Sequence, residues 1–169
     1  MKLDEAKDKF VQAWGSLGSN WGIPKTMAQV HALLLISEKP LSAEDIMSQL
    51  DISRGNVNLN VRSLIDWGIV DRVTVKGERR EFFTAEKDIW KVATMIANQR
   101  RKRELEPMLK VLSQVKVVDE SGADPEALKA FTSTIENIEN FSGKADVLLD
   151  KLIKADQHWF TGTLLKLVK

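Results

Sequence analysis

The sequence of 169 residues contains no cysteine, no tyrosine and only four prolines. Without cysteine the chain can form no disulfide, thiolate zinc site or iron–sulfur cluster, and it has no cysteine nucleophile. The two histidines, His31 and His158, are far apart in sequence and show no metal-ligand spacing. We expect His31 to be a packing residue and His158 to lie at a surface or interface. We therefore expect no bound metal and no cofactor.

Long hydrophobic runs are missing as well. The longest, Ala32 to Ile36, is far shorter than the roughly 20 residues that span a membrane. The acidic start of the chain lacks the apolar core of a secretory signal. We also find no nucleophile elbow, glycine-rich phosphate loop or paired carboxylates. These absences predict a cytoplasmic protein that has no membrane partner and is not an enzyme.

The net charge is only +1, from 25 basic and 24 acidic side chains. Taken alone, this balance argues against a phosphate-rich partner. However, all arginines lie between Arg54 and Arg103, whereas the residues from Glu104 onward hold eight lysines and eleven acids. Arginine suits bidentate contacts to phosphate and guanine. The average therefore hides a basic middle region and an acidic C-terminal region.

Apolar residues at helical spacing predict two helices at the start of the chain, over 2–17 and 24–37. We expect glycines to break the first helix, at Gly15, Gly18 and Gly22. Pro24 suits the first turn of the second helix, and Pro40 is expected to stop it. A third helix should start at Ser42, because a serine followed by an acid three residues later resembles a capping box.

The next predicted helix runs from Ser53, its expected N-cap, to Trp67. Its apolar residues share one face, whereas the remaining surface carries asparagine, arginine and serine: Arg54, Asn56, Asn58, Asn60, Arg62 and Ser63. Asparagine and arginine are suited to hydrogen bonds with adenine and guanine, whereas an ordinary solvated face would mix lysine and glutamate. For Leu59 and Asn60 the face stays open, since one residue of phase error turns either inward.

A β-hairpin is predicted next, with strand residues up to Val75 and a return strand over 79–84. Lys76 lies at its turn, and Arg79 and Arg80 lie on the predicted return strand. A capped helix, a tight turn, a second helix and a hairpin are together typical of a winged helix-turn-helix. The alternative is that the polar face and the hairpin are plain solvated surface, or that the hairpin binds a protein.

The segments Ile52 to Val57, Leu64 to Val70 and Lys76 to Arg80 resemble those of MarR-type winged-helix repressors. They are most similar to the branch that includes the bacterial repressor of glycine betaine synthesis genes. The resemblance covers roughly residues 22–107 and implies a homodimer that binds double-stranded operator DNA and represses transcription. The predicted DNA-binding residues are Ser53, Arg54, Gly55, Asn56, Asn58, Arg62, Lys76, Arg79 and Arg80.

The remainder of the chain is predicted to be helical. A long helix over 86–114 is expected to kink or restart at Pro107. A further helix starts at Asp124-Pro125 and is expected to break at Ser142-Gly143, before a last helix that carries Trp159 and Phe160. Apolar residues at spacings of three and four predict a narrow seam for helix–helix contact, formed by Leu128, Phe131, Ile135 and Ile138. This seam could fold back on its own chain, but we favour dimerisation.

We therefore expect a mainly α fold with a small β-hairpin. Its expected organisation is an N-terminal dimerisation helix over 1–22, a winged helix-turn-helix domain over 23–90 and a C-terminal helical dimerisation region over 91–169. The basic run Arg100 to Arg103 could bind phosphate, or could in part pair internally with Glu104 or Glu106.

Two further alternatives stay open. The five tryptophans could form an aromatic cage for a small cationic effector, although filling of the core and the dimer interface is the simpler explanation. The winged helix could also serve as a protein-interaction module without specific DNA binding.

Overall fold

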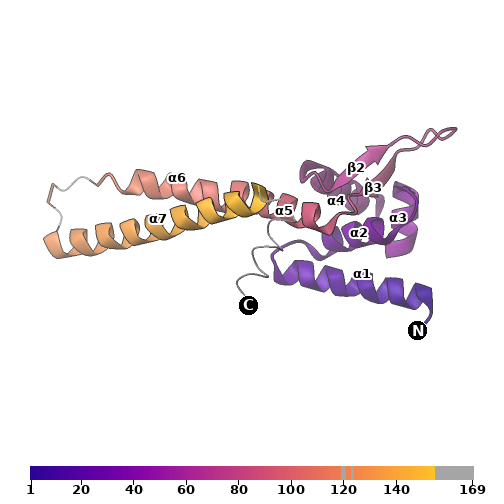
Figure 1. Cartoon of the computed structure of the whole chain (residues 1–169), viewed down its shortest axis with the longest axis horizontal. Coiled ribbons are helices and arrows are strands. Elements are labelled where there is room, and N and C mark those ends of the chain that lie inside the picture. Colours follow the sequence, from indigo (N-terminus) through magenta and orange to yellow (C-terminus); the bar gives the residue numbers. More distant parts are fainter. Residues whose placement is uncertain (119–120, 123, 155–169) are drawn as a thin grey trace, which may run out of the picture. The chain divides into compact units, whose positions relative to one another are not determined.

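The computed structural model describes residues 1–118, 121–122 and 124–154. It forms two compact units, Met1–Val92 and a second that begins at Ala93. Helices predominate in both units, and the first unit also contains a small antiparallel sheet (Figure 1). The predicted fold class is therefore confirmed. In the described ranges no helix is long and apolar enough to cross a membrane.

The first unit is a helical core with the sheet at one side. Its elements in chain order are α1 (Leu3–Asn20), α2 (Lys25–Ile36), β1 (Leu41–Ser42), α3 (Ala43–Leu50), α4 (Arg54–Asp66), β2 (Val70–Val73), β3 (Phe82–Ala85) and the start of α5 (Ile89–Arg100). α2 lies at the centre, because it packs on α1, α3, α4 and β3. The largest fully buried apolar side chains come from α2, α3, α4 and the start of the hairpin: Val30, Leu34, Ile46, Val57, Leu64, Ile69 and Val70.

Two glycines lie inside α1 and do not break it, so that prediction is wrong. Gly15 and Gly18 are buried where α2 packs on α1. A Cβ atom on Gly18 would lie 2.5 Å from Cβ of Ala28, and one on Gly15 would lie 2.7 Å from Cγ of Gln29. The missing side chains let the two helices approach closely, and this packing outweighs the low helix propensity of glycine. The helix ends at Asn20, two residues before Gly22, whose φ is 73°.

We predict that Gly18→Ala destabilises the first unit by about 1–3 kcal/mol, because the added methyl group would overlap with Cβ of Ala28 on α2. Urea denaturation followed by circular dichroism measures the change. Gly55→Ala in α4 is the matched control, since a Cβ atom there would meet only Oγ of Ser53, at 3.9 Å. We expect this control to be as stable as the wild type or up to about 1 kcal/mol more stable. Equal stabilities of the two variants would contradict the prediction.

The sheet has three strands in the order β1-β3-β2. β2 and β3 form the predicted hairpin, in which Val70 pairs with Ala85 and Val73 with Phe82. β1 was not predicted; its two residues pair with β3, Leu41 opposite Phe83. The strands are also shorter than predicted. Residues 74–81 lie outside the ladder, so Arg79 and Arg80 belong to the hairpin tip and not to the return strand.

The C-terminus of α2 is capped by a side chain that lies far from it in sequence. Nζ of Lys87 donates hydrogen bonds to the carbonyls of Leu34 and Leu35, each at 2.7 Å, and of Ser37 at 2.8 Å. A cation at this position satisfies terminal carbonyls and favours the helix dipole. Burial lowers the pKa of Lys87. The helix that Lys87 caps ends at Ile36, and Pro40, the predicted stop, lies beyond this end.

His31 lies in α2 and is buried, with 2% of its surface exposed. Its ring lies 6.1 Å from that of Trp14 in α1, centroid to centroid. Burial lowers the pKa of His31 to about 4, and the positive charge of Lys87 acts in the same direction. The imidazole is therefore neutral at neutral pH and packs in the core, as expected from the sequence. His158 lies outside the described residues.

The second unit is built from the end of α5, the π-helical segment η1 (Arg101–Leu105), α6 (Glu106–Val115) and α7 (Pro125–Lys154). Pro107 explains η1. A proline inside an α-helix lacks an amide donor and crowds the carbonyl four residues earlier. Here the backbone widens before the proline, and the amide of Glu106 donates to the carbonyl of Arg101. The predicted restart of the helix at Pro107 is thus confirmed.

α7 runs unbroken through Ser142 and Gly143, so the predicted break is wrong. Ser142 is buried, and a small side chain at this point fits the side of α7 that packs on α6 and η1. The predicted apolar seam also divides between two faces. Leu128 and Ile135 are half-buried, whereas Phe131 and Ile138 are exposed. Trp159 and Phe160 lie outside the described residues.

Candidate DNA-binding surface

The helix-turn-helix begins with a well-formed cap on α3. The amide of Asp45 donates to Oγ of Ser42 at 3.2 Å, and the amide and hydroxyl of Ser42 donate to Oδ2 of Asp45 at 2.9 and 2.7 Å. The predicted capping box is confirmed, with aspartate in place of glutamate. The hydroxyl and amide of Ser42 hold the pKa of Asp45 below its usual value.

The turn between α3 and α4 is fixed by backbone geometry and a second cap. Asp51 ends α3 in the left-handed conformation, with a φ of 52°. Ser53 then caps α4, since its Oγ accepts the amide of Asn56 at 3.3 Å. The first amides of an α-helix have no carbonyl partner within the helix, and helix N-termini of this kind bind phosphate.

α4 has one buried face and one exposed face. Val57, Asn60, Val61 and Leu64 face the core. The exposed face carries Arg54, Gly55, Asn56, Asn58, Leu59 and Arg62. The phase left open by the sequence is thereby settled. Asn60 turns inward and its Nδ2 donates to the carbonyl of Asn56 at 2.8 Å, whereas Leu59 turns outward. The predicted contact residues of α4 therefore share one exposed face.

One of these residues is held by an ion pair. Nη2 of Arg54 lies 2.6 Å from Oε1 of Glu44 in α3, and both side chains are well exposed. An exposed pair of this kind contributes only about 0.2–1 kcal/mol. A phosphate group can therefore replace Glu44 as the partner of Arg54. The pair links α3 to the first turn of α4.

We predict that Glu44→Gln strengthens the binding of duplex DNA by about 1.5- to 5-fold, which is the free energy of an exposed ion pair that phosphate contact must break. Fluorescence anisotropy with a labelled duplex measures the affinity. Asp8→Asn in α1 is the control, because it removes one exposed negative charge without freeing an arginine. An equal gain for both variants would show that only net charge matters.

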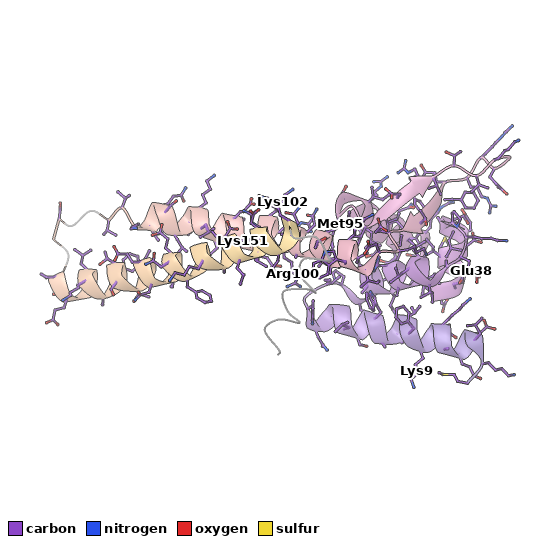
Figure 2. All side chains as sticks on the ribbon, viewed as in Figure 1. Lys9, Glu38, Met95, Arg100, Lys102 and Lys151 are labelled. Atoms are coloured by element: carbon purple, nitrogen blue, oxygen red, sulfur yellow. The ribbon has the colours of Figure 1, made fainter. Side chains whose placement is uncertain are left out.

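The hairpin tip, residues 74–81, carries charges of both signs. Figure 2 shows its side chains projecting from the ribbon. Arg80 is tied back, since its guanidinium donates to Oε2 of Glu78 at 3.1 and 3.2 Å and lies 5.4 Å from the ring centre of Phe82. Arg72 pairs with Glu81 at 2.8 Å. Two of the arginines in the hairpin are therefore paired with glutamates, and fewer positive charges are free for a partner than the sequence alone indicates.

Three basic side chains of the predicted DNA-binding surface have no partner among the described residues. Among the residues that the structure describes, the side chains of Arg62, Lys76 and Arg79 form no ion pair or hydrogen bond, and all three are exposed. Arg62 lies on α4, and Lys76 and Arg79 lie at the hairpin tip. These side chains are free to contact an anionic partner without breaking an existing contact.

Part of the basic run Arg100 to Arg103 forms ion pairs within the chain. The guanidinium of Arg101 donates to Asp146 of α7, at 3.1 Å for one of two hydrogen bonds, and lies 3.5 Å from Asp150. This contact holds the pKa of Asp146 below its usual value. Arg100 lies 3.9 Å from Glu104. The expectation that at least one member pairs internally is confirmed. Arg100 pairs with the expected Glu104, whereas the partner of Arg101, Asp146, was not expected.

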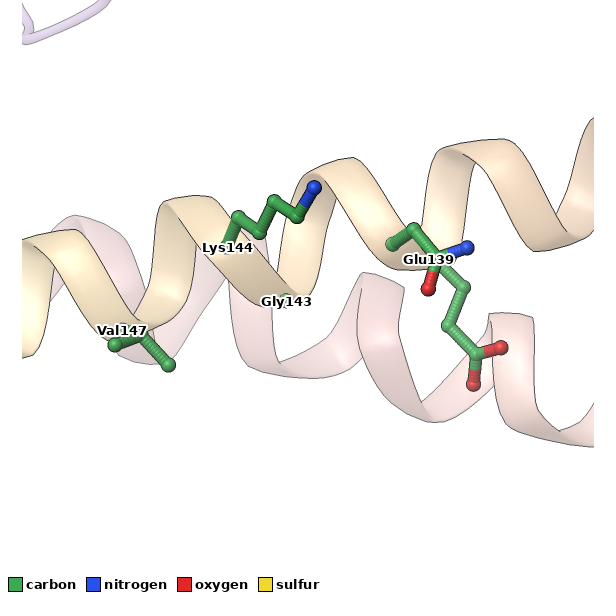
Figure 3. A pocket seen from close by; sticks show the side chains of 5 residues that line it. Glu139, Gly143, Lys144 and Val147 are labelled. Carbon is green, nitrogen blue, oxygen red and sulfur yellow. The ribbon is translucent and has the colours of Figure 1, made fainter.

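α7 also bears a hollow, lined by Glu139, Asn140, Gly143, Lys144 and Val147 (Figure 3). All five residues belong to the same helix, so they do not enclose a small molecule on several sides as ligand sites do. Trp14 contacts Phe10 and His31, and 60% of Trp21 is exposed. Neither observation assigns an effector site.

The α3-turn-α4 unit followed by the β2–β3 hairpin defines a winged helix-turn-helix domain. The comparisons with known proteins agree: residues 21–81 match the MarR family. The chain thus carries a MarR-type winged-helix domain, and the resemblance seen in its motifs is confirmed.

The curated relatives are distant. The chain is 23% identical over 88 residues to YvaV and 22% identical over 88 residues to OpcR, named as an HTH-type transcriptional regulator and an HTH-type transcriptional repressor of Bacillus subtilis (strain 168). Both matches cover 52% of this chain, and they cover 50% of YvaV and 48% of OpcR. The chain thus spans about half the length of these relatives.

Two comparisons extend further along the chain. GbsR, an HTH-type transcriptional repressor of the same organism, is 20% identical over 138 residues, which are 82% of this chain and 73% of GbsR. A crystal structure of a transcriptional regulator superposes with a TM-score of 0.65 at 17% identity, covering 88% of this chain and 95% of the other. This likeness shows that the two chains share a fold.

Proposed function

We propose that this chain is a sequence-specific DNA-binding regulator of transcription. The observation that carries the proposal is the exposed face of α4, on which the side chains of Asn56, Asn58 and Arg62 form no hydrogen bond or ion pair with other described residues. An α-helix fits the major groove, where amide and guanidinium groups read adenine and guanine. The cap at Ser53, with Arg54 beside it, is suited to an adjacent phosphate.

The hairpin tip supports this proposal through its free cations. Lys76 and Arg79 lie on the wing that follows α4, and wing and helix together could contact backbone and groove. The two named repressors among the relatives, OpcR and GbsR, favour repression as the sense of regulation. In this proposal the chain represses by occupying its operator, and a small-molecule effector that relieves the repression would bind elsewhere.

We further propose that the regulator is a homodimer, and the second unit supports this. Among its described residues only Leu112 and Ser142 are buried. A pair of helices buries one stripe each and leaves the other apolar side chains in water, whereas a stable core needs further elements. A second copy supplies such elements, and a two-fold dimer presents two α4 helices to a palindromic operator.

The dimer contact falls on a distinct face of α7. One side of α7 pairs with its own chain, through Glu139 with Lys116 and Asp146 with Arg101. A second, apolar side stays exposed and repeats at spacings of seven, three and seven residues: Phe131, Ile138, Phe141 and Leu148, with exposed fractions of 43%, 39%, 75% and 60%. This spacing is the heptad pattern of a helix–helix seam. We call these four residues the outer seam of α7.

Selection of bound duplexes from a random DNA library tests the proposal, followed by titration of the selected duplex at several salt concentrations. We expect one enriched palindromic sequence, and an affinity that falls steeply with salt because phosphate contacts release counterions. Failure to enrich any sequence, together with no salt-dependent binding, would contradict the proposal. That result would favour a protein-interaction module.

A further inference from the structure

The exposed face of α4 carries one residue that its fold does not explain. Leu59 is 66% exposed, whereas the next residue, Asn60, is only 7% exposed. An amphipathic helix places its apolar side chain inside and its polar side chain outside. At these two positions α4 does the reverse.

This reversal makes both residues less favourable for the stability of the fold than the usual arrangement. Burial of the Asn60 amide is tolerated because Nδ2 donates to the carbonyl of Asn56, but an apolar side chain there would need no such partner. Leu59 meanwhile gains nothing from burial. Single exposed leucines are common, so exposure alone does not assign a role. Departures from the pattern that the fold prefers are expected at functional sites.

The position of Leu59 within the polar face points to its partner. On a helix surface its neighbours are the residues three and four positions away, which here are Gly55 and Asn56 on one side and Arg62 and Ser63 on the other. Gly55 adds no side chain, and a Cβ atom there would meet only Oγ of Ser53. Leu59 is therefore an apolar group with open space beside it, surrounded by polar groups.

In the major groove the apolar group on a base edge is the C5-methyl group of thymine. We propose that Leu59 contacts this methyl group and makes the domain select thymine at one position of each half-site. Asn56, one turn away, is placed to read an adenine in the neighbouring step. This inference rests on the proposed DNA-binding function. It adds a residue that determines specificity through an apolar contact, which the hydrogen-bonding side chains of α4 cannot make with a methyl group.

Replacement of thymine by uracil tests the inference, because uracil lacks only the C5-methyl group. Each thymine of the library-selected duplex is replaced in turn, and affinities are measured for the wild-type chain and for Leu59→Ala. We expect one thymine per half-site at which uracil weakens wild-type binding about fourfold, the factor that burial of one methyl group contributes. With Leu59→Ala the same replacement should have no effect.

Leu17→Ala is the matched control, since Leu17 is an exposed leucine of α1, 46% exposed. This variant should keep the wild-type response to uracil. Thermal denaturation confirms that each variant is folded. If the wild type selects a duplex but Leu59→Ala keeps the full uracil response, the inference is wrong and the proposed function stands. If the wild type selects no duplex, both fail.

Discussion

Arg62→Ala is expected to weaken binding of the selected operator by about 1–3 kcal/mol per half-site, because a bidentate arginine–guanine contact discriminates by this amount. In a dimer on a palindromic site the loss counts twice. Arg62 is exposed on α4 and has no partner among the described residues, so its removal leaves no buried group unsatisfied. We expect the stability of the variant to stay within about 0.5 kcal/mol of the wild type. Titration of the selected duplex measures the loss.

Two matched variants separate base reading from attraction to phosphate. Arg62→Lys keeps the charge but cannot form the bidentate contact, so it should lose most of the specific affinity while retaining nonspecific binding. Arg79→Ala at the wing should weaken binding of all sequences alike and lower the dependence on salt by about one phosphate contact. An Arg62→Lys variant that matches the wild type would show that Arg62 contacts the backbone and not a base.

The sequence allowed the winged helix to be predicted because its signals are local. Ser42 with Asp45 and Ser53 with Asn56 form caps within three residues, and turn chemistry and apolar spacing act over similarly short distances. Two features were missed because they depend on distant contacts. β1 is only two residues long and pairs with β3, and Lys87 caps α2 across fifty residues or more.

The glycines show that distant contacts can also overrule a local signal. Gly15, Gly18 and Gly143 were predicted to break helices on the basis of their low intrinsic propensity, yet each lies inside one. Packing against α2 explains Gly15 and Gly18, and this packing depends on residues elsewhere in the chain. In the same way, the single seam predicted for residues 128–138 combined two faces of α7, which only the position of α6 distinguishes.

Phe141→Glu is expected to abolish dimerisation. Phe141 is the most exposed member of the outer seam, at 75%. Burial of a phenylalanine side chain contributes about 1.5–3 kcal/mol, and a two-fold interface contains the residue twice. The substitution should therefore raise the dissociation constant of the dimer by a factor on the order of 100 to 10,000, with a further cost for the desolvation of glutamate. Sedimentation equilibrium measures this constant.

Val147→Glu is the matched control, because Val147 is also an exposed apolar residue of α7, at 55%, but lies off the outer seam beside Gly143 (Figure 3). This variant should remain dimeric. Both glutamates are helix formers, so the helical content measured by circular dichroism should match that of the wild type. On DNA, Phe141→Glu should bind a single half-site with unchanged affinity but lose the gain from two joined half-sites. A Phe141→Glu variant that stays dimeric would place the dimer contact on another face.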